Sequence, residues 1–271
     1  MATMIALRMR AITASALVPV AALLLAGCGG APGRGEAAER SAAPSPGTAA
    51  KPAGDAAVPE ATTFTTVEGA PADRGREATD GLVVQPVKPL PVLDRPGGNR
   101  VATLPTEQLG GPTWVPVVES SGGWRRVLLP SRPNRASGWI SGEGLREART
   151  SYLVTVDLGD RRLTLRESGR TVGRWKVAIG EAATPTPTGR TFVMAQLAPE
   201  KKQPSPLVLP LGAHSDTLDT FGGGPGTVAL HGWNDVSVFG RAATHGCVRV
   251  PDEALRKLSR VPLGTLVLIN D

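Results

Sequence analysis

The stretch Thr244-His245-Gly246-Cys247-Val248-Arg249, preceded by His231-Gly232-Trp233, decides how the C-terminal part of this 271-residue chain is interpreted. It places two of the three histidines of the chain close to one of its two cysteines. The other cysteine, Cys28, closes Leu25-Ala26-Gly27-Cys28 after an apolar run. If residues 1–27 direct export, Cys247 is left as a single thiol outside the cytosol, where thiols usually pair or are lost. We therefore interpret Cys247 as a nucleophile.

Residues 1–27 have the composition of an export signal. Arg8 and Arg10 precede an apolar stretch, residues 11–25, that is too short to span a membrane and ends in small residues. The Leu-Ala-Gly-Cys ending resembles the bacterial lipobox, which implies cleavage before Cys28 and attachment of a lipid to its sulfur. An ordinary secretory signal and an uncleaved anchor are alternatives, and all three place the remaining chain outside the cytoplasm.

Composition divides that remaining chain into three zones. Residues 28–80 are dominated by Ala, Pro, Gly, Ser and Thr and hold few large apolar side chains, so we expect a disordered tether. Residues 81–148 and residues 151–271 hold enough apolar positions to form two small domains.

The charge of the chain is mildly positive. The formal net charge of +6 becomes +4 without Arg8 and Arg10, since residues 1–27 contain no acid. The basic residues are spread along the chain and no basic run is interleaved with aromatic residues, which argues against nucleic-acid binding.

Short β-prone runs separated by turn residues fill residues 81–148. Trp124-Arg125-Arg126-Val127 and Gly138-Trp139-Ile140 are such runs, and Pro96-Gly97-Gly98 is such a turn. We expect a small closed barrel, because closure leaves no open strand edges. The spacing resembles bacterial SH3-like domains, which implies a wall-targeting or spacing role. Trp124 and Trp139 are either core residues or ligand contacts.

Alternating apolar positions open residues 151–271 and predict a β-meander of two hairpins, through residues 152–156, 162–165 and 172–179. One helix is predicted over residues 251–258, with proline and acids in its first turn. We expect Cys247 to lie just ahead of this helix, where the helix dipole and a neighbouring imidazolium favour the thiolate.

Motifs of this region identify a family. The succession Thr184-Pro185-Thr186-Pro187-Thr188-Gly189, then Ala229-Leu230-His231-Gly232, then Thr244-His245-Gly246-Cys247-Val248-Arg249 resembles L,D-transpeptidase catalytic domains of the YkuD type. The resemblance covers residues 151–271. It implies a β-rich fold with one or two short helices, and a peptidoglycan cross-linking activity through a thioester on the cysteine. It also implies that carbapenems acylate Cys247, and it calls for no metal or organic cofactor.

The resemblance also implies roles for single residues. His231 carries over as the base, and a backbone carbonyl at Gly232 would fix its tautomer. Backbone N–H groups around His245 and Gly246 would form an oxyanion hole. Arg249 either binds a substrate carboxylate or pairs with Asp252. The remaining candidates for substrate binding are Thr244, Trp233 and His214. Thr244 replaces the commoner serine of the motif. The alternative for Trp233 is a core position, and the alternative for His214 is a position on the surface.

Other interpretations of the same residues remain to be compared. In one of them, Cys247 is a buried structural thiol. In another, it binds zinc together with His231 and His245, but no second cysteine accompanies these residues in the motif. We expect a mainly β, monomeric, lipid-anchored enzyme that faces the cell wall and acts on peptidoglycan stem peptides. The alternatives are an L,D-carboxypeptidase, with water as acceptor, and a wall-binding lipoprotein without activity.

Overall fold

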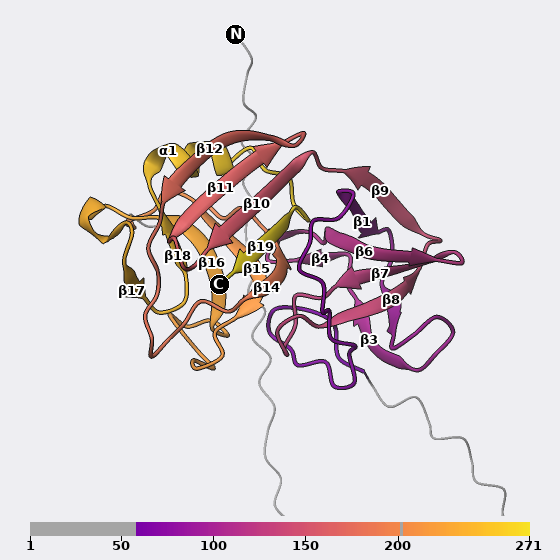
Figure 1. Cartoon of the computed structure of the whole chain (residues 1–271). Coiled ribbons are helices and arrows are strands. Elements are labelled where there is room, and N and C mark those ends of the chain that lie inside the picture. The colour runs from indigo at the N-terminus through magenta and orange to yellow at the C-terminus, as the bar shows by residue number, and fades with distance from the viewer. Residues whose placement is uncertain (1–57, 201–202) are drawn as a thin grey trace, which may run out of the picture. The chain divides into compact units, whose positions relative to one another are not determined.

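Two β-rich regions follow one another in the part of the chain that the structure describes, residues 58–200 and 203–271 (Figure 1). The structure is a computed structural model. The predicted export signal, Cys28 and residues 28–57 of the predicted tether lie outside the described residues. The expectation of a mainly β protein is confirmed, since the described residues hold one α-helix and one short 3-10 helix besides strands.

The first region is built on a seven-stranded sheet with the order β3-β2-β8-β7-β6-β1-β9. Neighbouring strands pair antiparallel, as hairpin-connected short strands do. A separate two-stranded ladder joins β4 and β5. The strands are β1 (Leu82–Pro86), β2 (Leu90–Leu93), β3 (Arg100–Leu104), β4 (Glu107–Gln108), β5 (Gly111–Pro112), β6 (Val115–Ser121), β7 (Trp124–Leu128), β8 (Ser137–Ser141) and β9 (Leu145–Arg149).

Alternation of side chains along these strands builds the core of the first region. Val84, Leu104, Val127 and Ile140 are fully buried in one apolar cluster. Trp139 is also buried, as the core alternative for this residue predicted. The likeness of this region to SH3-like domains stays a prediction.

The second region holds a five-stranded sheet, β12-β11-β10-β19-β14, a three-stranded sheet, β15-β16-β18, and a two-stranded ladder of β13 and β17. The predicted meander is confirmed, because β10, β11 and β12 pair antiparallel in sequence order. The strands are β10 (Tyr152–Asp157), β11 (Arg162–Glu167), β12 (Arg170–Lys176), β13 (Ile179–Gly180), β14 (Gly189–Phe192), β15 (Val208–His214), β16 (Thr227–Gly232), β17 (Ala242–Thr244), β18 (Val248–Val250) and β19 (Leu266–Asn270).

Strand β19 is apolar on both faces, and both faces are covered. Val267 and Ile269 lie in the core of the second region, whereas Leu266 and Leu268 lie in the apolar cluster of the first region. A strand buried on both sides needs a nearly continuous apolar run, which Leu266–Ile269 supplies. All described residues belong to one compact unit.

The helix α1 (Asp252–Leu258) is confirmed, one residue shorter than predicted. It buries Ala254, Leu255 and Leu258, has acids in its first turn and bases in its last turn, and so complements the helix dipole at both ends. The 3-10 helix η1 spans Val236–Val238. In the described ranges, no helix has the length and apolarity needed to cross a membrane.

The prediction of a disordered tether is wrong for residues 58–80, which we call the strap. The strap runs along the first region, with short bridges of Glu60 to Thr103, Thr66 to Arg132 and Ala72 to Ala136. Two of its apolar side chains, Ala61 and Val67, are fully buried, whereas Phe64 is 67% exposed. The order of this polar segment therefore comes from backbone hydrogen bonds and polar contacts, which composition does not report.

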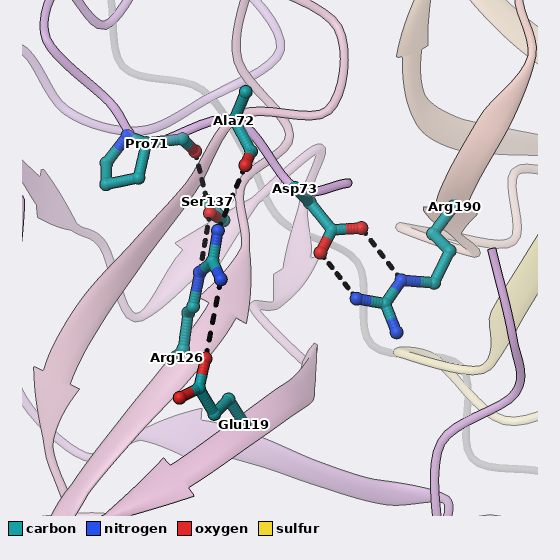
Figure 2. A network of polar contacts seen from close by, with 7 residues as sticks. All are labelled: Pro71, Ala72, Asp73, Glu119, Arg126, Ser137 and Arg190. Carbon is teal, nitrogen blue, oxygen red and sulfur yellow. Dashed lines mark hydrogen bonds and ion pairs between the residues drawn. The ribbon is translucent and has the colours of Figure 1, made fainter. Parts of the chain in front are cut away.

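Polar side chains fasten the strap at its middle (Figure 2). The Arg126 guanidinium donates hydrogen bonds to Ala72 O and to Ser137 Oγ, both at 3.0 Å. Asp73 faces Arg190 of β14, and the two form a two-pronged ion pair with Nε–Oδ2 at 2.7 Å. The Asp73 side chain is 1% exposed and that of Arg190 is 11% exposed. A charge-assisted fork of this kind stays strong where water is excluded.

We expect Asp73→Ala to lower the free energy of unfolding by about 3–5 kcal/mol, because it leaves the Arg190 charge buried without a partner. Asp80→Ala is the matched control in the same strap. Asp80 pairs with Arg149 at 2.6 Å, and both side chains are 61% exposed, so its loss should cost less than about 1 kcal/mol. Urea unfolding of both variants checks this, and equal losses would contradict the buried-pair argument.

Candidate active site

The parallel pairing of β16 and β18 brings the two site motifs together. The register places Leu230 opposite Val248 and His231 opposite Arg249. Leu230 and Val248 point into the apolar core, so His231 and Arg249 point to the other face of the sheet. Cys247 precedes β18 by one residue and lies two residues before Arg249, on the same side. His231 and the half-buried thiol of Cys247 thus share one face.

Cys247 ends a tight turn, residues 244–247, that joins β17 to β18. The buried Thr244 hydroxyl accepts a hydrogen bond from Gly246 N at 3.2 Å and donates one to Cys247 O at 2.6 Å. Gly246 has a φ of +112°, a region that side chains disfavour and that glycine adopts freely. Thr244 is 2% exposed and its hydroxyl is bonded inside the turn, which does not support its candidate role in substrate binding.

The Thr-Pro-Thr-Pro-Thr-Gly motif holds this turn from a second side. Thr184 Oγ1 donates to Thr244 O at 3.1 Å, and Thr186 Oγ1 donates to Gly246 O at 2.8 Å. Both threonines are buried. The sequence alone assigned no role to this motif, because the hydroxyls and the carbonyls that they reach are 60 positions apart in the chain.

The His231 ring is oriented by a hydrogen bond to the next residue of its own strand. Its Nδ1 lies 2.9 Å from the carbonyl oxygen of Gly232, an acceptor, so Nδ1 carries the proton and Nε2 is left as the basic nitrogen. Gly232 N in turn donates to Ser205 Oγ at 2.7 Å. Ser205 is buried and was not among the sequence candidates, because it lies in a loop without a recognisable motif.

Both titrating groups of the site are shifted toward their neutral forms. Burial raises the pKa of Cys247 above its ordinary value of 9.0, against smaller opposing effects of a backbone hydrogen bond with Ala229 and of the Arg249 charge. Burial lowers the pKa of His231 below its ordinary 6.5, the Gly232 carbonyl opposes this, and Arg249 adds to it. At neutral pH the resting site holds a thiol and a neutral imidazole.

The expectation that a helix dipole favours the thiolate is wrong for a structural reason. Strand β18 lies between Cys247 and α1, so the start of the helix is about 16 Å of extended chain away, at 3.3 Å per residue. The dipole effect is confined to the first turn of a helix. The cysteine lies on a strand-to-strand turn and not on a strand-to-helix connection.

Arg249 lies against Trp233, and Trp233 lies against His231. The Arg249 guanidinium carbon is 3.6 Å from the centroid of the Trp233 ring, and the Trp233 ring meets the His231 ring edge-on at 6.0 Å. Arg249 Nη1 donates to Ala243 O at 3.1 Å. The alternative of an ion pair with Asp252 finds no support, since none of the ion pairs among the described residues includes Arg249.

His245 and His214 have different surroundings from those of His231. His245 is exposed and stacks on Phe221, with ring centroids 5.2 Å apart. His214 is 0% exposed, and its Nε2 lies 2.8 Å from Thr63 O in the strap. The candidate role of His214 in substrate binding and its surface alternative are both wrong, because this side chain is enclosed by the strap.

The site as described consists of a thiol, an imidazole with a free Nε2 and a short turn of backbone. In residues 58–200 and 203–271, no group of three or more His, Cys, Asp and Glu side chains is placed to hold a metal ion. A thiol, a base and nearby backbone donors are the components of acyl transfer by covalent catalysis.

This chain is similar to known proteins. The sequence profile of YkuD, described as the L,D-transpeptidase catalytic domain, matches residues 151–269. The YkuD protein of Bacillus subtilis is 30% identical over 151 residues, which cover 53% of this chain and 85% of that protein. The YkuD protein of Bacillus licheniformis is 32% identical over 154 residues, 54% of this chain and 86% of that protein. A solved L,D-transpeptidase from Mycobacterium smegmatis is 14% identical, covers 58% of this chain and 99% of that chain, and has a TM-score of 0.37. On the sequence matches, this chain belongs to the YkuD family of L,D-transpeptidase catalytic domains.

Proposed function

We propose that this protein is a peptidoglycan L,D-transpeptidase that works through a thioester on Cys247. The observation that supports the proposal is the parallel pairing of β16 with β18, in which His231 lies opposite Arg249, two residues after Cys247. Family membership supports a transpeptidase function acting on stem peptides.

Acylation is the first half-reaction in this proposal. Cys247 Sγ attacks the carbonyl carbon of the third residue of a tetrapeptide stem, while its proton passes to Nε2 of His231. The tetrahedral intermediate then collapses, the carbon–nitrogen bond to the terminal D-Ala breaks, and His231 returns the proton to the leaving amine. Because both groups rest in their neutral forms, proton transfer accompanies the attack and no preformed thiolate is needed.

Backbone donors of the 244–247 turn would stabilise the intermediate. Gly246 N–H is already bonded to the Thr244 hydroxyl, so the N–H groups of His245 and Cys247 are the remaining candidates for the oxyanion hole. The clamps from Thr184 and Thr186 hold this turn in place before substrate arrives. Such preorganisation avoids a reorganisation cost at the moment of reaction.

Deacylation completes the cycle. A side-chain amine of a second stem, activated by Nε2 of His231, attacks the thioester; a carbon–nitrogen bond forms, the carbon–sulfur bond breaks, and the sulfur regains a proton. Arg249 and Trp233 line the same face as His231, which supports contact with a substrate carboxylate.

L,D-transpeptidases typically act outside the cytoplasm on the wall, and we propose that a lipid on Cys28 anchors this one to the membrane.

We expect Cys247→Ala to abolish covalent labelling by a carbapenem and the cross-linking of tetrapeptide stems, because the proposal makes the Cys247 sulfur the acyl acceptor. Intact-protein mass spectrometry with imipenem, and analysis of muropeptide products, measure the two effects. His231→Gln keeps the nucleophile and should slow acylation by about 10²- to 10⁴-fold, the range that a general base contributes. Cross-links formed by Cys247→Ala would refute the proposal.

The same assay separates the alternative functions. Release of D-Ala with a shortened stem and no cross-link identifies a carboxypeptidase, with water as acceptor. A wild-type protein that forms no adduct and no product, and still sediments with isolated sacculi, is a wall-binding lipoprotein. The sedimentation assay is best done on the whole chain. Residues 81–148 pack on β19, so a variant that lacks them would also lose part of the packing of the second region.

The pH profile of acylation gives a further test. At low pH the His231 imidazole holds a proton and cannot take one from the thiol, so the rate falls as pH drops through the pKa of His231. Because burial lowers that pKa, with Arg249 adding to it, the acid limb should be centred below pH 6.5. Arg249→Gln removes the added positive charge, so its acid limb should move to higher pH.

Arg249→Lys is the matched control for this profile, because it keeps the charge and should leave the acid limb near its wild-type position. The measurement is the second-order rate of imipenem acylation across the acid range. A limb that does not move in Arg249→Gln would show that the charge does not reach His231.

A further inference from the structure

Arg132 of the first region donates hydrogen bonds to the loop of residues 215–226 in the second region. Loop 215–226 joins β15 to β16, and Ser215 N donates to Gly226 O at 2.8 Å across its base. The Arg132 guanidinium donates to three carbonyl oxygens of this loop, those of Ser215 at 3.1 Å, Leu218 at 3.2 Å and Pro225 at 3.0 Å. The donors of one planar side chain thus join both sides of the loop.

Neighbouring residues hold the start of the same loop. Asn134 accepts from His214 N at 2.8 Å and donates to His214 O and to Asp216 Oδ1, both at 2.7 Å. Thr63 of the strap contacts the hydroxyl of Thr227, the first residue of β16, at 2.6 Å. The strap and residues 132–134 therefore fix both ends of loop 215–226, and β16 with it.

The tip of the loop reaches the cysteine turn. Phe221 and Gly224 exchange two backbone hydrogen bonds of 3.0 Å, and the two glycines between them both have positive φ, as a two-residue hairpin turn of type I′ requires. This turn presents the Phe221 ring, which is 52% exposed, against the ring of His245. His245 is two residues from Cys247, so the stacked pair is attached to the turn that carries the thiol.

We propose that Arg132 is a positioning residue of the active site, and that Phe221, stacked on His245, is a wall of the groove that receives the donor peptide. This inference rests on the proposed transpeptidase function. An exposed aromatic ring on a rigid hairpin offers an apolar face to a peptide at little entropic cost. The first region is then part of the substrate site and not only a spacer.

We expect Arg132→Ala and Phe221→Ala each to lower kcat/KM for a tetrapeptide donor by about tenfold, mainly through KM, which corresponds to about 1.4 kcal/mol. Imipenem acylation of Cys247 should change less than about threefold in both variants, because the small acyl donor needs the thiol and His231 more than the distal wall. Arg95→Ala, an exposed arginine of the same region, is the control and should match the wild type.

A double-mutant cycle decides whether Arg132 acts through Phe221. If it does, Arg132→Ala combined with Phe221→Ala should be no worse than either single variant, since both remove the same contact. Fully additive losses, or a wild-type kcat/KM in Arg132→Ala, overturn the inference. If Arg132→Ala does not fold, as judged by a thermal melt, Phe221→Ala provides the test, because the Phe221 side chain is exposed. A wild-type KM in Phe221→Ala overturns the inference. Restoration of KM in Phe221→Tyr supports it.

Failure of the underlying function has a different signature. A wild-type protein with neither imipenem adduct nor D-Ala release would remove the proposed function itself. An active wild type whose Arg132 and Phe221 variants behave like the Arg95 control would remove only the present inference.

Discussion

The register between β16 and β18 is the constraint on which the site depends. A parallel pair with Leu230 opposite Val248 points two apolar residues into the core and leaves His231 and Cys247 on the opposite face. A slip by one residue would exchange the faces and separate the base from the nucleophile. The buried valines and leucine of these strands therefore fix the register of the candidate site as well as adding stability, and the hydrogen bonds from Thr184 and Thr186 fix the turn that carries the thiol.

Electrostatics follows from the same placement. The strands hold both titrating groups where burial disfavours charge, so the thiol and the imidazole are neutral together. The positive Arg249 lies on the Trp233 ring and not against a carboxylate. Among the described residues, no ion pair includes Arg249. In the proposed reaction this positive charge would lie near a site where negative charge develops, and the sulfur would become charged only as it attacks.

Sequence patterns predicted the parts of this protein that are local. The meander, helix α1 and the two motifs of the site all have short-range signatures, and the structure contains them. The strap escaped prediction because Asp73 finds its partner Arg190 only 117 residues later, and its polar composition is that of a disordered segment. His214 was misplaced for the same reason, since its burial depends on Thr63. The short β18 was not predicted, because its three residues overlap the cysteine motif and are too few to show a periodicity.

A neutral, half-buried thiol has a consequence for the survival of the protein in an oxidising compartment. Oxidation by peroxide and alkylation by general electrophiles both proceed through the thiolate, and they follow its population and its exposure. Burial of Cys247 keeps that population small. Cys247 is thereby shielded from indiscriminate oxidation and alkylation. Under the proposed mechanism, a ligand that engages His231 would meet a reactive sulfur, so resistance to damage and selectivity for substrate would share one cause, the desolvation of these two groups.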